Sequence, residues 1–130
     1  MIPLHKVFVP DDIEPMINDL RGVISSGWVG EGPKVQLFEK AMGEYVGTDN
    51  VTALNSCTSS LQLALRLAGV GPGDEVITTA MTCMATNLPI LLAGATPVWA
   101  DVDPDTGNIS STSIGERITA NTKAIMIVHW

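Results

Sequence analysis

The fold class of this chain is decided by the stretch that runs from Glu75-Val76-Ile77-Thr78 to Thr96-Pro97-Val98-Trp99-Ala100. Both ends of the stretch are short apolar runs with β-branched residues, which is typical of strands. Residues 85–93 between them are long and apolar enough for one helix. Short strands that alternate with helices are typical of a parallel sheet, because a parallel pair needs such a crossover. The stretch therefore predicts an α/β fold, with a mainly parallel sheet and flanking helices.

The same alternation continues on both sides of this unit. Before it, Val51-Thr52-Ala53-Leu54 is predicted to be a short strand, and residues 59–68 are predicted to be a helix. After it, residues 111–118 predict a weak helix and residues 124–128 predict a fourth strand. We therefore expect residues 51–130 to form one region of alternating strands and helices.

Two amphipathic helices are predicted ahead of this region. Apolar side chains recur at helical spacing over residues 11–26 and again over residues 34–46, and a glycine follows each run as a stop. The loop between them, residues 28–33, is rich in glycine and contains one large aromatic side chain. We expect these helices and their loop to form a region of their own, over residues 1–50.

The last predicted strand bears on how the chain is organised. Residues 124–128 form an apolar run of the kind that is buried on both faces of a parallel sheet. His129 and Trp130 follow it, so no helix would cover this strand. A finished domain seldom ends in this way, and we expect the chain to be the N-terminal part of a larger domain. An uncovered strand also favours association, as a homodimer or with a complementing C-terminal part.

Composition and charge exclude several classes of function. Of the 130 residues, 45% are hydrophobic and 16% are charged, which is typical of a globular interior and excludes a disordered chain. The net charge of −7, without a stripe of lysine and arginine, argues against nucleic-acid binding. No apolar run is long enough to span a membrane, and the N-terminus shows no signal-peptide pattern. We expect a cytoplasmic protein with no membrane partner.

Cysteines and histidines are too few for a disulfide scaffold or a metal site. Cys57 and Cys83 are the two cysteines, and together with two histidines they lack the spacing of zinc ligands. The segment Asp101–Asn108 superficially resembles a calcium loop, but it contains a proline and lacks the terminal glutamate. We interpret that segment as a solvated turn, and we expect reduced thiols and no bound metal.

The segment Asn55–Leu61 is the strongest candidate for chemistry. It follows a predicted strand, opens a predicted helix, and consists mainly of small residues with hydroxyl groups. The N-terminus of a helix carries free N–H groups and a partial positive charge, and it therefore binds phosphate. Thr58 and Ser59 can add hydrogen bonds from their hydroxyl groups. Plain helix capping is an alternative interpretation, since serine and threonine are preferred caps.

The glycine-rich segment Gly69–Asp74 does not predict a dinucleotide site. A Rossmann glycine loop follows a strand and opens a helix, whereas this segment follows a helix and precedes the strand at Glu75. We interpret it as a turn that Asp74 fixes. The segment Thr82–Asn87, in contrast, follows the carboxyl end of a strand, where parallel sheets bind ligands. Cys83 is therefore a second candidate, although a buried, inert thiol is the commoner role of a free cysteine.

Seven blocks of the sequence occur in a recognisable order. They are Gly27-Trp28 with Gly32-Pro33 and Phe38-Glu39, then Ser56–Leu61, Gly71–Ile77, Thr82–Asn87, Gly94-Ala95, Asp101–Asp103 and Thr122–Ile125. In this order the chain resembles the N-terminal part of the DegT/DnrJ/EryC1/StrS sugar aminotransferases over nearly its whole length. The resemblance implies part of the cofactor-binding large domain of a fold-type-I enzyme that depends on pyridoxal phosphate (PLP).

The resemblance also implies roles for particular residues. Thr58 and Ser59 match the cradle that holds the phosphate of PLP in the family. Cys83 matches the place where the family usually has an aromatic ring stacked on the pyridine ring. Trp28 and Gly30 match a loop near the sugar-nucleotide site. The implied partners are a nucleotide-sugar substrate, an amino-acid donor of the amino group, and a second copy of the chain.

No catalytic residue is expected within the chain. The family's Schiff-base lysine, and the aspartate that pairs with the pyridinium nitrogen, match positions beyond residue 130. Lys6, Lys34, Lys40 and Lys123 match no such position, so the chain alone is expected to be inactive. The resemblance favours part of an aminotransferase that acts on a keto group of a nucleotide-linked sugar in polysaccharide or glycoconjugate biosynthesis. A sugar dehydratase of the same fold, and a non-catalytic fragment that binds a phosphorylated ligand, are the alternatives.

Overall fold

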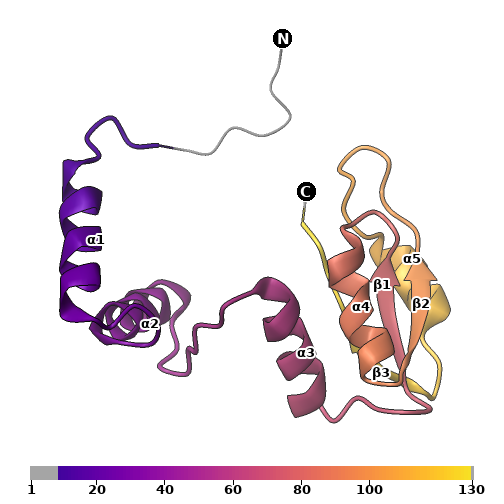
Figure 1. Ribbon diagram of the computed structural model, residues 1–130. Coiled ribbons are helices and arrows are strands. Elements are labelled where there is room, and N and C mark those ends of the chain that lie inside the picture. Colours follow the sequence, from indigo (N-terminus) through magenta and orange to yellow (C-terminus); the bar gives the residue numbers. More distant parts are fainter. Residues whose placement is uncertain (1–8, 130) are drawn as a thin grey trace. The chain divides into compact units, whose positions relative to one another are not determined.

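The structure is a computed structural model that describes residues 9–129 (Figure 1). These residues divide into two compact units, one that ends at Ala53 and one that begins at Leu54. The first unit contains two helices, and the second contains a sheet with three helices.

The first unit consists of helix α1 (Glu14–Ser26) and helix α2 (Pro33–Val46). Both lie where the helical spacing of apolar residues predicted them. Gly27 and Gly47 end the helices with φ angles of 76° and 78°, in the left-handed region that glycine tolerates best. The glycine-rich loop between the helices is held to α1 by Ser26. The hydroxyl of Ser26 accepts a hydrogen bond from the backbone N–H of Trp28, at 3.2 Å.

The strand predicted over residues 51–54 is absent from the structure, and that prediction is wrong. The backbone N–H of Ala53 donates to the carboxylate of Glu39, at 2.8 Å, where a strand residue would donate to a neighbouring strand. A four-residue apolar run becomes a strand only when the fold brings a partner strand beside it, and here a side chain of α2 takes that place. Residues 51–54 therefore connect the two units as irregular chain.

The second unit is built on a sheet of three parallel strands, as the sequence predicted. They are β1 (Glu75–Thr79), β2 (Thr96–Ala100) and β3 (Thr122–Ile125), in the spatial order β2-β1-β3. Ile77 in the central strand pairs with Val98 on one side and with Ile125 on the other. Four of the five residues of β1 are buried, because the strand is central in the sheet and its Val76 packs in the core with Leu65 and Ile90.

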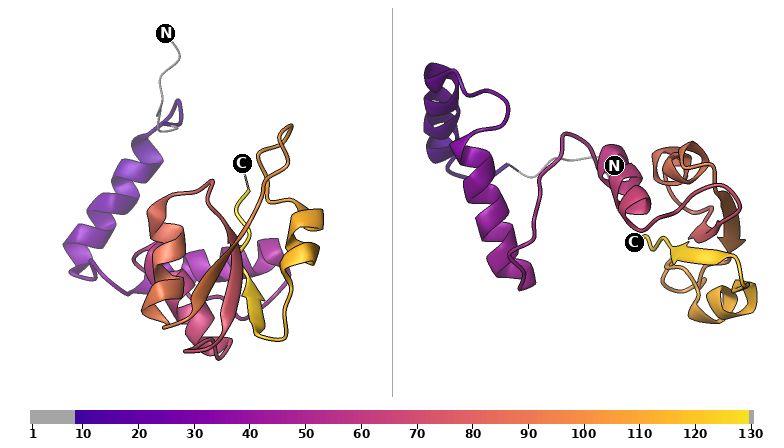
Figure 2. Two further views of the ribbon diagram at one scale, coloured as in Figure 1. Left: turned by 90° about the vertical axis from the view of Figure 1, so that its right-hand side faces the viewer. Right: turned by 90° about the horizontal axis from the view of Figure 1, so that it is seen from below.

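Three helices flank this sheet, which confirms the expected α/β class. Helices α3 (Cys57–Leu67) and α4 (Met84–Leu92) pack together on one face, and α5 (Ser111–Arg117) lies on the other face beside β2 (Figure 2). The hydrophobic core lies between the sheet and the first pair of helices. Its buried members are Leu65, Val70, Val76, Ile90, Ala95 and Met126.

Side-chain hydrogen bonds fix the turns that connect these elements. The carboxylate of Asp74 accepts from the N–H of Gly71 at 2.9 Å, which confirms the turn predicted between α3 and β1. In the loop after β2, the carboxylate of Asp103 accepts from the N–H groups of Asp105 and Thr106, at 3.0 and 2.9 Å. These bonds lower the pKa of the exposed Asp103 carboxyl, with the Thr106 amide as the main cause. The segment is a turn closed by its own aspartate.

The end of β3 differs from its prediction in extent. The strand runs from Thr122 to Ile125, so it begins two residues and ends three residues earlier than expected, and the N–H of Met126 still donates to the carbonyl of Ile77. Met126 is buried, whereas Ile125 and Ile127 are 44% and 54% exposed. One side of this run therefore faces the core and the other carries uncovered apolar side chains. Across residues 9–129, the structure has no helix that is long and apolar enough to cross a membrane.

Candidate functional site

The topology of the second unit brings two helix N-termini to one edge of its sheet. Helix α3 is joined to the start of β1 by the short turn at residues 68–74, so it runs antiparallel to the strand. Its N-terminus therefore lies at the edge where β1 ends, and α4 begins at that same edge directly after the strand (Figure 1). The carboxyl ends of parallel strands are where α/β sheets bind ligands. This edge carries Thr58, Ser59 and Cys83.

Ser56 caps helix α3 and occupies part of its N-terminal hydrogen-bonding capacity. Its hydroxyl oxygen accepts from the N–H of Ser59 at 3.1 Å and donates its proton to the Ser59 hydroxyl at 2.8 Å. The carbonyl of Ser56 accepts from the N–H and the hydroxyl of Ser60, at 3.1 and 3.0 Å. Helix capping, the alternative interpretation of this segment, is therefore confirmed for Ser56, whose hydroxyl caps the backbone N–H of Ser59.

Capping leaves the first turn of the helix with unused donors. Within the described residues, no hydrogen bond is made by the backbone N–H groups of Cys57 and Thr58 or by the hydroxyl of Thr58. The hydroxyl of Ser59 accepts from Ser56, which leaves its own proton free to donate. These donors stand at the positive end of an 11-residue helix. Donors arranged in this way can bind an anion such as a phosphate.

The segment that leads from β1 into α4 is held by side chains of both elements. The hydroxyl of Thr79 accepts from the N–H of Met81 at 3.0 Å, and the hydroxyls of Thr82 and Thr86 lie 2.9 Å apart. The amide of Asn87 accepts from the hydroxyl of Thr78 at 2.7 Å and donates to the carbonyl of Thr79 at 3.0 Å.

Asn87 is a residue whose position sequence reasoning missed. It was noted within the block Thr82–Asn87, but no role was predicted for its side chain. The signal that could have found it is an amide near the start of a mostly apolar helix, a short loop after a strand that ends in threonines. Such an amide needs partners, and the end of the strand supplies them.

Cys83 is the last residue of the segment between β1 and α4. It is the N-cap residue of α4, with extended backbone angles of −64° and 141°, and its side chain makes no capping bond. Its thiol is free and exposed among the described residues. Cys57, at the first position of α3, is also a free, exposed thiol. The structure thus leaves the side chain of Cys83 available to a ligand at this edge.

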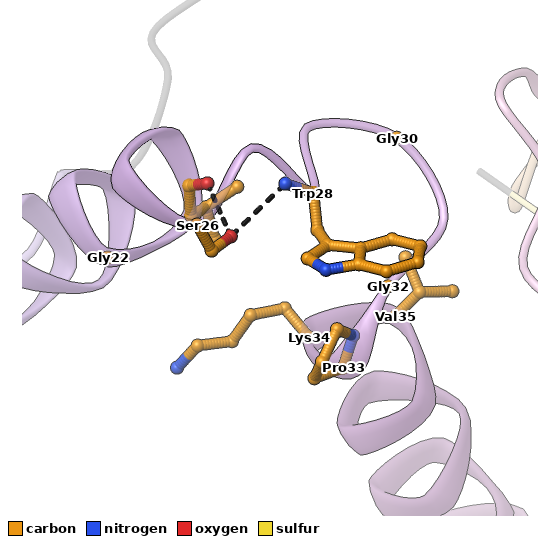
Figure 3. A pocket seen from close by; sticks show the side chains of 9 residues that line it. Gly22, Ser26, Trp28, Gly30, Gly32, Pro33, Lys34 and Val35 are labelled. Atoms are coloured by element: carbon orange, nitrogen blue, oxygen red, sulfur yellow. Dashed lines mark hydrogen bonds between the residues drawn. The ribbon is translucent and has the colours of Figure 1, made fainter.

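The other two predicted site residues lie in the first unit. Trp28 and Gly30 line a surface pocket of about 210 Å³ between the end of α1 and the start of α2 (Figure 3). The indole of Trp28 is 63% exposed. A Cβ atom on Gly32 would lie 3.0 Å from the Cβ of Trp28, so the side chain packs closely over the loop backbone. The ammonium group of Lys34, another lining residue, lies 2.8 Å from the carboxylate of Asp19.

Comparison with known proteins gives this architecture a family. Residues 10–130 match the DegT/DnrJ/EryC1/StrS aminotransferase family. The chain belongs to this family of aminotransferases, which confirms the resemblance read from the sequence.

Individual relatives agree with this assignment. The spore coat polysaccharide biosynthesis protein SpsC of Bacillus subtilis (strain 168) is 46% identical over 114 residues, which are 88% of this chain and 29% of that protein. The crystal structure of AtS13 from Actinomadura melliaura is 40% identical, with a TM-score of 0.88, over 100% of this chain and 34% of that one. The PLP form of Spr1654 from Streptococcus pneumoniae is 41% identical, with a TM-score of 0.79, over 89% of this chain and 30% of that one.

The chain spans about a third of the length of these relatives. The similarity therefore concerns the part of the relatives that this chain covers.

Proposed function

We propose that this chain is the N-terminal part of the PLP-binding large domain of an aminotransferase. The enzyme would move an amino group from an amino acid to a keto group of a nucleotide-linked sugar, in the biosynthesis of a polysaccharide or glycoconjugate. The observation that carries the proposal is the set of unused donors at the N-terminus of α3, in a chain that belongs to this family. PLP is the cofactor expected of the complete protein, since relatives have been solved in PLP and PMP forms.

The donor set at α3 fits the phosphate group of PLP. A phosphate presents several acceptor oxygens and negative charge, and the site presents two backbone N–H groups, two hydroxyl protons and a helix dipole. Thr58 would contribute its N–H and its hydroxyl, and Ser59 its hydroxyl. Ser56 would act indirectly, because its bond to Ser59 turns that hydroxyl proton away from the helix cap.

The exposed thiol of Cys83 fits a position beside the pyridine ring. When bound, PLP supplies an electron sink that stabilises negative charge on the carbon next to the transferred nitrogen. The protein's part is to orient the ring, and Cys83 would do so by contact of a polarizable sulfur atom with the ring. That contact covers less area than the aromatic side chain usual in the family.

The loop after α1 would contribute to substrate binding. The pocket lined by Trp28 and Gly30 is largely apolar, and the exposed indole offers a flat surface to a ring of the substrate. The glycines of the loop allow a ligand to approach its backbone. We assign residues 1–50 to the N-terminal helices and this substrate loop, and residues 51–130 to the alternating part of the large domain.

We propose that none of the lysines of this chain is the one that transamination requires. Among the described lysines, Lys34 pairs with Asp19 at 2.8 Å and Lys40 lies 3.9 Å from Glu44. Lys123 is exposed in β3, and Lys6 lies outside the described residues. We therefore propose that the residues for covalent and acid–base chemistry belong to the part of the relatives that this chain does not cover. The complete protein is proposed to act in the cytoplasm as a homodimer.

The proposal is tested by the amino-group half-reaction of the complete protein. The protein is saturated with PLP, single amino acids are added, and the absorption spectrum is followed for conversion of PLP to PMP. A nucleotide-linked keto sugar should then restore the PLP spectrum, and the matching sugar without the keto group should not. A spectrum that stays unchanged with every amino acid would contradict an aminotransferase.

A further inference from the structure

Asn87 joins the last two residues of β1 to the first turn of α4. Its side-chain oxygen accepts from the hydroxyl of Thr78 at 2.7 Å, and its side-chain nitrogen donates to the carbonyl of Thr79 at 3.0 Å. Thr78 and Thr79 are 0% and 1% exposed and Asn87 is partly buried, so these bonds are partly shielded from water. A buried bond of this kind holds its partners firmly, because breaking it leaves a buried polar group unpaired.

The hydrogen bonds of Asn87 join the two elements on either side of the segment that contains Cys83. Residues 80–83 connect Thr79, at the end of β1, to Met84, at the start of α4. Asn87 belongs to α4 and is hydrogen-bonded to the end of β1, so it links the two elements that flank this segment. Around this segment, the N–H of Thr82 donates to the carbonyl of Ala80, and the N–H of Thr86 donates to the carbonyl of Cys83, at 3.0 and 2.9 Å. The backbone of Cys83 is therefore placed relative to the sheet by Asn87, while its thiol makes no capping bond and is exposed.

We infer that Asn87, oriented by the hydroxyl of Thr78, is a positioning residue that sets Cys83 against the cofactor ring. The inference rests on the proposed function, which puts the ring of PLP at Cys83. Asn87 itself does not touch the cofactor in this account. It acts by fixing the height of residues 80–83 above the end of β1, and so the distance of the thiol from a ring whose phosphate is held by α3.

A matched pair of substitutions isolates this role. Thr78→Val keeps the shape of the buried side chain but removes the hydroxyl that orients Asn87, and Thr78→Ser keeps the hydroxyl. In the complete protein, Thr78→Val should weaken PLP binding about tenfold, the scale of one buried hydrogen bond, and Thr78→Ser should restore it. Inorganic phosphate, measured as a competitor of PLP, should bind Thr78→Val with unchanged affinity, because the α3 site is intact. Where Thr78→Val does not fold, Asn87→Asp replaces it, since a carboxylate cannot donate to the Thr79 carbonyl.

A double-mutant cycle shows whether the effect passes through Cys83. In a Cys83→Ala protein, Thr78→Val should change PLP affinity by less than about twofold, because no thiol remains to be positioned. The visible circular dichroism of bound PLP, which reports ring orientation, should differ between Thr78→Val and Thr78→Ser.

The outcomes separate the two proposals. Equal PLP affinity and equal dichroism in Thr78→Val and the unchanged protein would overturn the role of Asn87 and leave the proposed function standing. A tenfold loss that persists in the Cys83→Ala background would overturn it as well. Failure of the unchanged protein to bind PLP at all would overturn the proposed function, and this inference with it.

Discussion

The backbone of Thr48 lies so close to Gly43 that a side chain on residue 43 would collide with it. A Cβ atom on Gly43, in the last turns of α2, would lie 2.6 Å from the carbonyl oxygen of Thr48. The carbonyl of Gly43 in turn accepts from the N–H groups of Gly47 and Thr48, at 2.8 and 3.0 Å. The chain therefore folds back tightly over this glycine as it leaves the helix.

We expect Gly43→Ala to destabilise the first unit by about 1–3 kcal/mol, the range for forcing extra atoms into a filled space. Gly22→Ala is the matched control, because Gly22 lies in α1 and its added Cβ meets nothing within 4 Å. The control should stabilise by about 0.5–1 kcal/mol, since alanine favours the helix. Chemical denaturation followed by circular dichroism measures both. Equal effects of the two changes would show that the close approach is relieved without cost.

Removing the side-chain donors of α3 should weaken the cofactor. We expect Thr58→Val combined with Ser59→Ala to reduce PLP binding by about 1–3 kcal/mol in the complete protein, while the backbone N–H groups keep part of the affinity. Fluorescence titration with PLP measures the change. Ser60→Ala is the control, because the Ser60 hydroxyl is spent on the carbonyl of Ser56. If the double variant binds PLP as tightly as this control, the two residues serve as helix caps alone.

Enlarging Cys83 should help the cofactor. Because the thiol is exposed, a larger side chain has room at this edge, and Cys83→Tyr should strengthen PLP binding by about 0.5–1.5 kcal/mol if the rings stack. Thermal unfolding with and without PLP is the measurement. Cys57→Tyr, at the other exposed thiol, should give no such gain, since it would crowd the phosphate end. A loss of stability in Cys83→Tyr that PLP does not relieve would remove Cys83 from the site.

Acid should weaken the loop after β2 through Asp103. The pKa of this carboxyl is lowered from its ordinary value of 3.8 in the folded protein, mainly by the Thr106 amide. A lowered folded pKa contributes stability above the unfolded pKa, and that contribution is lost as pH falls from 3.8 through the folded pKa. We expect Asp103→Asn, which keeps an acceptor oxygen without the charge, to lose less stability over this range. Denaturation midpoints of both proteins below pH 4, measured at about half-unit steps, test this; parallel curves would contradict it.

The sequence predicted the parts of the fold that depend on local patterns. Helices α1 and α2 follow from apolar spacing and from Gly27 and Gly47 as stops, and β2 was predicted with its observed bounds. The strand expected at residues 51–54 failed because strand formation needs a neighbour, and no local pattern reveals that Glu39 takes the N–H of Ala53 instead. A partner fourteen residues away in the chain is set by tertiary packing.

For the candidate site, too, the sequence indicated the segment but not the hydrogen-bond partners of its side chains. A segment of small hydroxyl residues at a helix start indicated a candidate anion site, and the structure leaves the N–H groups of Cys57 and Thr58 without a hydrogen bond among the described residues. The sequence alone could not divide the serines between capping and binding, because that depends on which hydroxyl turns toward which N–H. The bond between Asn87 and Thr78 was out of reach for the same reason, since it joins two elements.

The place of β1 in the sheet has a consequence for synthesis on the ribosome. This strand lies between β2 and β3 in space, yet it is made before either of them. It can pair with β2 once Ala100 has emerged from the ribosome. Its other edge can pair with β3 only after 25 further residues, when Ile125 has been made. At about 5–20 residues per second, the nascent sheet spends about one to five seconds with one edge of its central strand unpaired. An unpaired strand edge is open to pairing with other chains, and slower translation of this stretch would lengthen that exposure.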